Sequence, residues 1–158
     1  MEILVKSSAE TQQLGRTLGQ LLQPGDVLVV SGELGAGKTT FVQGIAAGMG
    51  IEAQVTSPTF TIIHEYQGDE YPLYHIDAYR LEGAAEIDEL GLEDYFYGDG
   101  VTAVEWAEKI EGQLPPDYLY VKLEKMPAHP DHRRIRIGEE GSGTYAGLIE
   151  ELRQVCRC

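Results

Sequence analysis

Apolar residues in the first part of the chain follow two different periods. Residues 3–5 are apolar and predict a short strand. Ser7 and Glu10 have the spacing of a capping box, in which Glu10 reaches back to the N-cap Ser7, so a helix should begin here. Leucines then recur at helical spacing until Pro24-Gly25. The continuous apolar run at residues 27–30 predicts a strand that is covered on both faces.

The rest of the chain alternates strand and helix patterns. A second helix is expected at residues 38–49, and the polar turn 67–70 separates two predicted strands. The further predicted elements are the strands 59–66, 71–77 and 101–105, an acidic helix at 84–90, a hairpin of strands 118–123 and 133–137, and a closing helix at 145–155. This alternation predicts an α/β fold with a largely parallel central sheet, to which the late strands add antiparallel pairing at one edge.

A glycine-rich segment joins the first buried strand to the second helix. Residues 32–39 read Gly-Glu-Leu-Gly-Ala-Gly-Lys-Thr, which is the phosphate-loop pattern in its proper strand and helix context. Such a loop points backbone N–H groups at phosphates, and the helix N-terminus adds its dipole. Lys38 is expected to reach the β- and γ-phosphates of ATP, or the β-phosphate of ADP, and the Thr39 hydroxyl to bind Mg²⁺. The predicted fold is therefore a three-layer domain of the P-loop NTPase type.

Two carboxylates stand where predicted strands end. Asp77 closes one strand and Glu105 closes another, and ligands of open α/β sheets bind at this edge. Either residue can hold Mg²⁺ while the other orients the attacking water. The alternative is that such a carboxylate only caps the next turn. The acidic residues of segment 86–94 are interpreted as a solvated face.

Three further features of the sequence have open interpretations. Hydroxyl residues flank Pro58 between the loop helix and the next strand, where they either meet the γ-phosphate or form an ordinary turn. His64 and His75 have no partner at metal-ligand spacing and are interpreted as strand residues. Trp106 follows Glu105, so its indole lies either beside the nucleotide or in the core.

Composition and charge narrow the classes of function. The chain has 158 residues, of which 12 are basic and 26 acidic, for a net charge of −14. This length and 42% hydrophobic residues predict a single domain over residues 1–158. The negative charge disfavours tight direct binding of RNA or DNA. No apolar run is long enough for a membrane span, and two cysteines near the C-terminus fit a cytoplasmic protein.

Four blocks of sequence, in order, resemble one known family. They are residues 32–40 (GELGAGKTT), 57–61 (SPTFT), 75–81 (HIDAYRL) and 104–108 (VEWAE). Together they resemble the TsaE family, formerly YjeE, whose members are small bacterial ATPases required for threonylcarbamoyladenosine modification of tRNA. The resemblance extends from about residue 7 to residue 136.

The resemblance implies roles for particular residues. Asp77 corresponds to the Walker B aspartate, Thr39 and Glu105 to the Mg²⁺ ligands, and Thr59 to part of the first switch segment, so that Lys38, Asp77, Glu105 and Thr59 form the catalytic set. Ser7 and Arg133 correspond to residues that flank the nucleoside. The phosphates are assigned to Gly35, Ala36, Gly37, Lys38, Thr39 and Thr40.

The resemblance also implies partners. These are TsaD, which transfers the threonylcarbamoyl group to adenosine 37 of tRNAs reading ANN codons, and TsaB, its non-catalytic relative. The chain would then be a partner-activated ATPase that meets tRNA only through the complex, and Arg80 is a candidate arginine finger. An acidic surface suits docking on a basic one. The alternatives are a small-molecule kinase and a nucleotide-binding regulatory module without catalysis.

Overall fold

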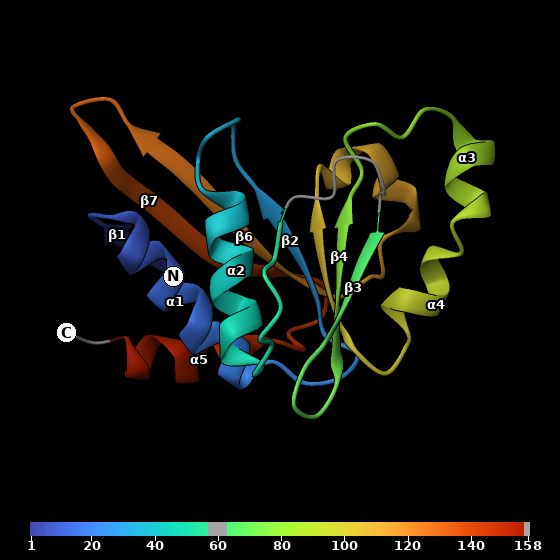
Figure 1. Ribbon diagram of the computed structural model, residues 1–158, viewed down its shortest axis with the longest axis horizontal. Helices are drawn as coiled ribbons and strands as arrows, with labels where there is room; N and C mark the ends of the chain where they lie inside the picture. Colours follow the sequence, from blue (N-terminus) through green and yellow to red (C-terminus); the bar gives the residue numbers. More distant parts are fainter. Residues whose placement is uncertain (57–62, 157–158) are drawn as a thin grey trace.

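The computed structural model describes residues 1–56 and 63–156 of the chain. Within these residues, seven strands form a single sheet in the order β1-β7-β6-β2-β5-β4-β3 (Figure 1). The strands are β1 (Glu2–Val5), β2 (Val27–Ser31), β3 (Ile63–Gln67), β4 (Pro72–Asp77), β5 (Val101–Glu105), β6 (Tyr118–Met126) and β7 (His129–Glu140). The helices are α1 (Ser8–Leu21), α2 (Lys38–Gly48), α3 (Ala84–Glu89), α4 (Leu92–Phe96), the 3-10 helix η1 (Ala107–Gln113) and α5 (Ala146–Val155).

The centre of the sheet is parallel and both of its sides are antiparallel. β2 pairs in parallel with β5 and β6, and β5 pairs in parallel with β4. β3 is antiparallel to β4 at one side, whereas β7 is antiparallel to both of its neighbours, β1 and β6, at the other. The sequence therefore predicted the mixed α/β class and the mostly parallel centre correctly, but placed antiparallel pairing at one edge only. The short turn between β3 and β4 makes a hairpin, and hairpin strands must run antiparallel.

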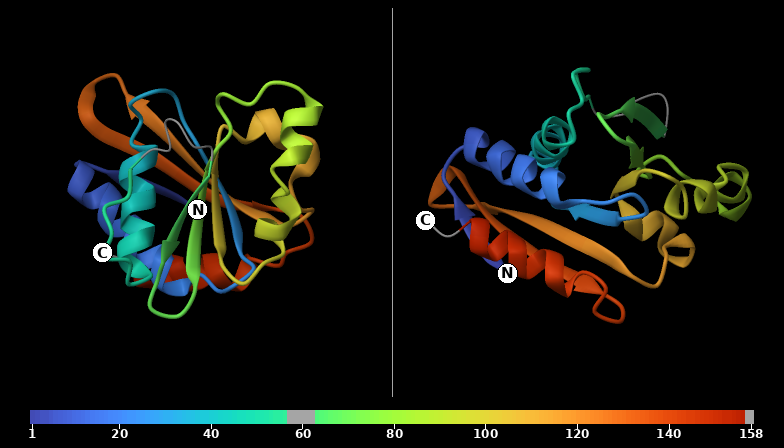
Figure 2. Two further views of the ribbon diagram at one scale, coloured as in Figure 1. Left: turned by 45° about the vertical axis from the view of Figure 1, so that its right-hand side comes forward. Right: turned by 90° about the horizontal axis from the view of Figure 1, so that it is seen from below.

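Helices α1 and α2 cover one face of the sheet side by side (Figure 2). Two glycines on each helix allow this approach, because a Cβ atom at Gly15 or Gly19 would overlap backbone of α2, and one at Gly44 or Gly48 would overlap backbone of α1. The core beneath them includes Leu18 and Phe41, both fully buried. The beginnings of the two helices are thus held close together.

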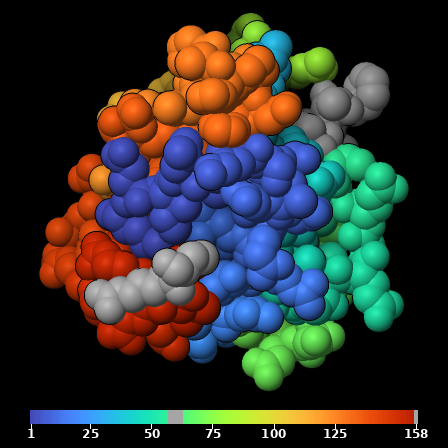
Figure 3. Space-filling view, turned by 90° about the vertical axis from the view of Figure 1, so that its left-hand side faces the viewer, coloured from blue at the N-terminus to red at the C-terminus, as the bar shows by residue number. Residues whose placement is uncertain are grey.

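The opposite face of the sheet is covered only in part. α4 and η1 pack there through Leu92, Phe96 and Ile110, together with Val104 of β5. On the β1–β7–β6 half, the residues that alternate with the core positions are exposed, among them Leu4 and Tyr120. Figure 3 shows the outer side of this half, where β1 and α1 lie between the β6–β7 hairpin and α5. Among the described residues, this second helical cover lies over β2, β5 and β4.

The first helix differs from the sequence prediction at its cap. Ser7 is the N-cap and its Oγ accepts the Glu10 backbone N–H at 3.1 Å, as predicted. The Glu10 carboxylate, however, accepts the backbone N–H of Lys6 at 2.6 Å, where a capping box would have it accept that of Ser7. Among the described residues, no helix is long and apolar enough to cross a membrane.

Candidate functional site

The loop between β2 and α2 has the backbone shape of an anion cradle. Gly35 and Gly37 have φ angles of 79° and 103°, a region that glycine adopts without steric penalty. Gly37 is the N-cap of α2, and no side chain caps this helix. The first turn, at residues 38–40, therefore presents backbone N–H groups that have no acceptor within the helix, with the positive end of the helix dipole behind them.

Lys38 is held inside the loop by neighbouring groups. It is 8% exposed, and its Nζ donates a hydrogen bond to the Gly32 carbonyl oxygen at 2.6 Å. The same Nζ lies 4.4 Å from the centroid of the Trp106 ring, a cation–π contact. Trp106 in turn packs against Tyr79 at 4.9 Å between ring centroids, and its own φ of 59° lies in the left-handed region. The indole thus lies beside the loop lysine and is half-buried. Its place shares features of both alternatives that the sequence left open, a position beside the nucleotide and a position in the core.

The two predicted carboxylates are neighbours in the sheet. Asp77 of β4 is paired in register with Glu105 of β5, at the end of the sheet where the loop lies. Asp77 is half-buried, and its Oδ1 accepts the backbone N–H of Tyr79 at 3.0 Å. Asp77 therefore does make the turn-capping contact that was the alternative for it. Glu105 is 2% exposed, and its Oε2 lies 2.5 Å from Nε2 of His75.

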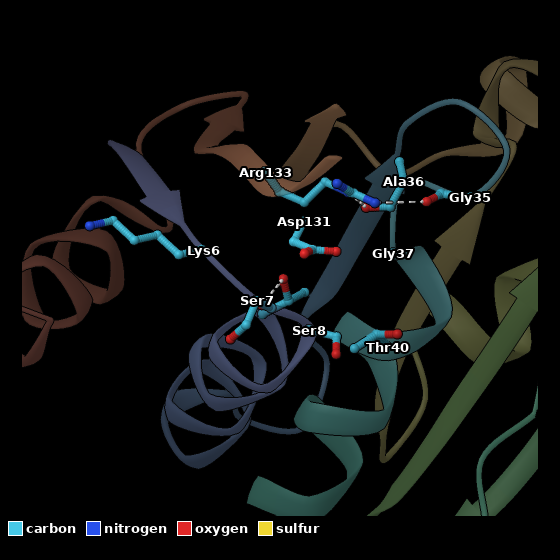
Figure 4. Close-up of a pocket in the computed structure, with 10 residues that line it drawn as sticks. Lys6, Ser7, Ser8, Gly35, Ala36, Gly37, Thr40, Asp131 and Arg133 are labelled. Atoms are coloured by element: carbon cyan, nitrogen blue, oxygen red, sulfur yellow. Dashed lines mark hydrogen bonds between the residues drawn. The ribbon is translucent and has the colours of Figure 1, made fainter. Parts of the chain in front are cut away.

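A pocket of about 300 Å³ opens beside the loop (Figure 4). Arg133 of β7 forms one wall, where its Nε donates to the Ala36 carbonyl oxygen at 3.0 Å and its Nη2 to that of Gly35 at 3.3 Å. Its Nη1 donates to the carbonyl oxygens of Pro130 and His132. The residues that line the pocket are Lys6, Ser7, Ser8, Thr11, Gly35, Ala36, Gly37, Thr40, Asp131 and Arg133. It is bounded by the starts of α1 and α2 and by the β6–β7 hairpin.

The structure brings most of the predicted site residues to one place. Six of the residues predicted to bind the nucleotide line the pocket: Ser7, Gly35, Ala36, Gly37, Thr40 and Arg133. Lys38 and Thr39 begin α2 next to them, with Thr39 half-buried. Thr59 and the rest of the proposed switch segment lie outside the described residues. Arg80 is exposed and follows β4 by three residues.

Sequence reasoning missed several residues of this region. Asp131 and Thr11 line the pocket. Asp131 lies on β7 and reaches it through the fold of the β6–β7 hairpin, whereas Thr11 lies on α1 one turn after Ser7. His75 does lie on a strand, β4, as interpreted, but the sequence did not show that it is fully buried against Glu105. Its spacing of two from Asp77 was the available signal, since alternate strand residues share one face.

A protein-family model and several known proteins match most of this chain. The family model "Threonylcarbamoyl adenosine biosynthesis protein TsaE" matches residues 5–135. The tRNA threonylcarbamoyladenosine biosynthesis protein TsaE of Bacillus subtilis is 48% identical over 143 residues, which cover 90% of this chain and 87% of that protein. The protein of the same name from Treponema pallidum is 42% identical over 123 residues, covering 78% of this chain and 90% of that protein.

The fold also has a close structural relative. The crystal structure of YdiB from Bacillus subtilis superposes with a TM-score of 0.84 at 39% identity, covering 99% of this chain and 96% of that one. Sheet, loop and pocket thus define a mixed α/β protein with a phosphate-loop motif at one end of a mixed sheet whose centre is parallel. The chain belongs to the TsaE family, whose members are involved in tRNA threonylcarbamoyladenosine biosynthesis.

Proposed function

We propose that this chain is a Mg²⁺-dependent ATPase that supports formation of threonylcarbamoyladenosine at position 37 of tRNAs reading ANN codons. It acts as a switch on the TsaB–TsaD complex, and hydrolysis is slow until that complex is present. One observation supports the proposal above the others: a buried lysine and a helix start with a glycine N-cap adjoin a pocket of about 300 Å³, and two strand-end carboxylates lie at the same end of the sheet.

The phosphates are assigned to the loop and the first turn of α2. Backbone N–H groups of residues 35–40 bind phosphate oxygens, and the helix dipole favours their negative charge. Lys38 already lies inside the loop, where the Gly32 carbonyl oxygen and the Trp106 ring hold its amine. A γ-phosphate competes with these neutral partners for the amine, because hydrogen bonds between two charged groups are stronger.

The residues present fit a Mg²⁺ ion. Mg²⁺ in nucleotide sites takes one or two carboxylates and fills its other positions with phosphates and waters. Glu105 supplies a buried carboxylate and Thr39 a half-buried hydroxyl, and within the described residues no group of three or more His, Cys, Asp or Glu forms a metal site of its own. When bound, Mg²⁺ neutralises charge on the β- and γ-phosphates. Asp77, next to Glu105 in the sheet, is proposed to orient the attacking water.

The nucleoside is assigned to the pocket. Arg133 closes its hairpin side through bonds to the loop carbonyl oxygens, and Ser7 lies at the opposite side at the start of α1. A nucleoside here lies alongside the loop with its phosphates directed toward Lys38. This arrangement gives ATP a site with walls from β7, α1 and α2.

The switch role is supported by charge and by the exposed acidic surface of the chain. The net charge is −14, and α3 has no buried residue, so its carboxylates are free to meet a basic partner. Arg80 is exposed three residues beyond β4, where a docked partner is able to orient it toward the phosphates. TsaB and TsaD are the proposed partners, and tRNA is met through them.

The test is the steady-state rate of ATP hydrolysis with Mg²⁺, measured for the chain alone, with purified TsaB–TsaD, and with both the complex and tRNA. We expect a slow rate alone and a clear increase when the complex is added. A rate that active partners leave unchanged would overturn the switch proposal. Transfer of phosphate to a small-molecule acceptor would instead identify a kinase, and retention of unhydrolysed ATP under every condition would identify a regulatory module.

A further inference from the structure

The contact between His75 and Glu105 is the shortest side-chain contact at the proposed Mg²⁺ site. Nε2 of His75 lies 2.5 Å from Oε2 of Glu105, and the two residues are 0% and 2% exposed. His75 Nδ1 is buried as well, and it has no hydrogen-bond partner among the described residues. The imidazole is therefore anchored to its surroundings through Glu105.

The sheet explains how the two side chains reach each other. His75 is paired in register with Ala103, and Asp77 with Glu105, so His75 lies one step inside the sheet from the carboxylate pair. His75, Asp77 and Glu105 share one face, because alternate residues of a strand point the same way and paired residues of neighbouring strands do so too. The small Ala103 side chain leaves room for the imidazole to extend diagonally to Glu105.

We propose that His75 is a positioning residue, which fixes the Glu105 carboxylate for Mg²⁺ bound with the nucleotide. The inference rests on the proposed function, since it concerns the same metal. Nε2–H donates to Oε2 and so orients the whole carboxylate, while Oε1 stays available to the ion. Carboxylates that bind metals are commonly held by a hydrogen bond of this kind, and loss of the second group reduces metal affinity by about 10- to 100-fold.

A role limited to packing makes a different prediction. A histidine that only fills space would affect the free energy of unfolding, and any side chain of similar volume would replace it. A positioning histidine affects the Mg²⁺ requirement of nucleotide binding, and only a side chain with a donor at the place of Nε2 would replace it. The two roles are therefore separated by the dependence of binding on Mg²⁺ concentration.

The experiment compares three variants of the full-length chain. His75→Leu removes the donor, His75→Gln puts an amide nitrogen near the place of Nε2, and His75→Asn puts one near the place of Nδ1. Calorimetric titration with a non-hydrolysable ATP analogue, repeated over a range of Mg²⁺ concentrations, gives the concentration that produces half of the Mg²⁺ effect. Circular dichroism and thermal unfolding establish that each variant is folded.

We expect His75→Leu to raise the Mg²⁺ concentration that produces half of the Mg²⁺ effect by about 10-fold or more. Binding of the nucleotide in the absence of Mg²⁺ should be unchanged. His75→Gln should remain within about 3-fold of the wild type. In a Glu105→Gln background, His75→Leu should add no further effect, because it acts through the missing carboxylate. If His75→Leu does not fold, the Gln and Asn variants make the same comparison, and only the Asn variant should be impaired.

Two different failures are distinguishable. If nucleotide binding depends on Mg²⁺ in the wild-type chain, and to the same extent in the Leu or Asn variant, the role of His75 is overturned. The proposed function then stays intact. Wild-type chain that binds no nucleotide, or binds it without regard to Mg²⁺, would overturn both.

Discussion

Two regions on either side of the phosphate loop are built in opposite ways. On one side, α1 and α2 are in backbone contact at Gly15, Gly19, Gly44 and Gly48, over a core that includes fully buried leucine and phenylalanine side chains. On the other side, beyond β4, α3 has no buried residue and α4 has two. The first region is rich in apolar contacts, and the second is short, acidic and exposed.

The difference assigns separate tasks to the two regions. The proposed phosphate binding needs a fixed geometry of the loop and of the first turn of α2, and the close α1–α2 contact favours one. Side chains that meet a partner must instead be accessible, and the carboxylates of α3 are accessible because the helix packs so little. The substitutions below break or sharpen this contrast, beginning with the largest expected effect.

Lys38→Ala should cause the largest loss, since it removes the cation that lies inside the loop. We expect hydrolysis of ATP to fall by at least about 100-fold, the scale on which a group that stabilises transition-state charge acts. Nucleotide binding should weaken by about 1.5–3 kcal/mol, measured by calorimetry. Lys109→Ala is the matched control, because Lys109 is exposed on η1. Wild-type binding by the Lys38 variant would contradict the phosphate-loop assignment.

Gly44→Ala tests the close contact of the helices. The new methyl group would overlap the carbonyl oxygen of Gln12, so α1 and α2 must separate, and we expect about 2–3 kcal/mol of lost stability in denaturant unfolding. Gly147→Ala in α5 is the control, because no atom lies within 4 Å of the new Cβ. It should be neutral or stabilising by up to about 1 kcal/mol. Equal stability of the two variants would show that the contact is not tight.

Neutralising the acidic side should leave folding unchanged and weaken partner activation. Asp88→Asn combined with Glu89→Gln removes two exposed charges of α3, and the unfolding free energy should change by less than about 0.5 kcal/mol. Stimulation of hydrolysis by TsaB–TsaD should require more complex, most clearly at low salt. Glu52→Gln with Glu151→Gln removes the same charge from exposed positions elsewhere and serves as the control. If both double variants lose the same amount of activation by TsaB–TsaD, only the net charge of the chain matters.

The smallest effect concerns the turn that precedes α5. Hydrogen bonds from the backbone N–H and the hydroxyl of Ser142 lower the pKa of Asp117 below its usual range. A lowered carboxyl pKa stabilises the fold above the unfolded pKa, and this contribution is lost as pH falls through the folded pKa. Asp117→Asn should therefore lower the melting temperature slightly at neutral pH, and the difference should begin to shrink at about pH 4 and disappear below the folded pKa. A difference that persists in acid would contradict this assignment.

Local sequence signals predicted the parts of the molecule that depend on neighbouring residues. The phosphate loop, the buried strand β2 and the start of α2 at Lys38 are all marked within a few positions. Asp77 and Glu105 were correctly expected at strand ends, because each closes an apolar run. That they are paired in register follows from the order of the strands, which no local pattern contains.

What the sequence did not predict depends on distant contacts or on short elements. The strands of the hairpin were expected at residues 118–123 and 133–137, but they extend to Tyr118–Met126 and His129–Glu140 because β6 and β7 pair with each other along their whole length. α4 and η1 were not predicted, since five and seven residues show too little periodicity. Glycine has a low helix propensity, so the glycines of α1 and α2 would weaken each helix. Only the close approach of the two helices explains why glycines occur there.

The central claim is that ATP hydrolysis at this loop supports repeated turnover of the TsaB–TsaD complex. The most direct measurement is the amount of threonylcarbamoyladenosine formed on tRNA per complex over time, with a threonylcarbamoyl donor and ATP supplied. The account predicts several modified tRNAs per complex with the wild-type chain, and no more with Lys38→Ala than with the complex alone. Equal yields with the wild-type and Lys38→Ala chains would contradict it.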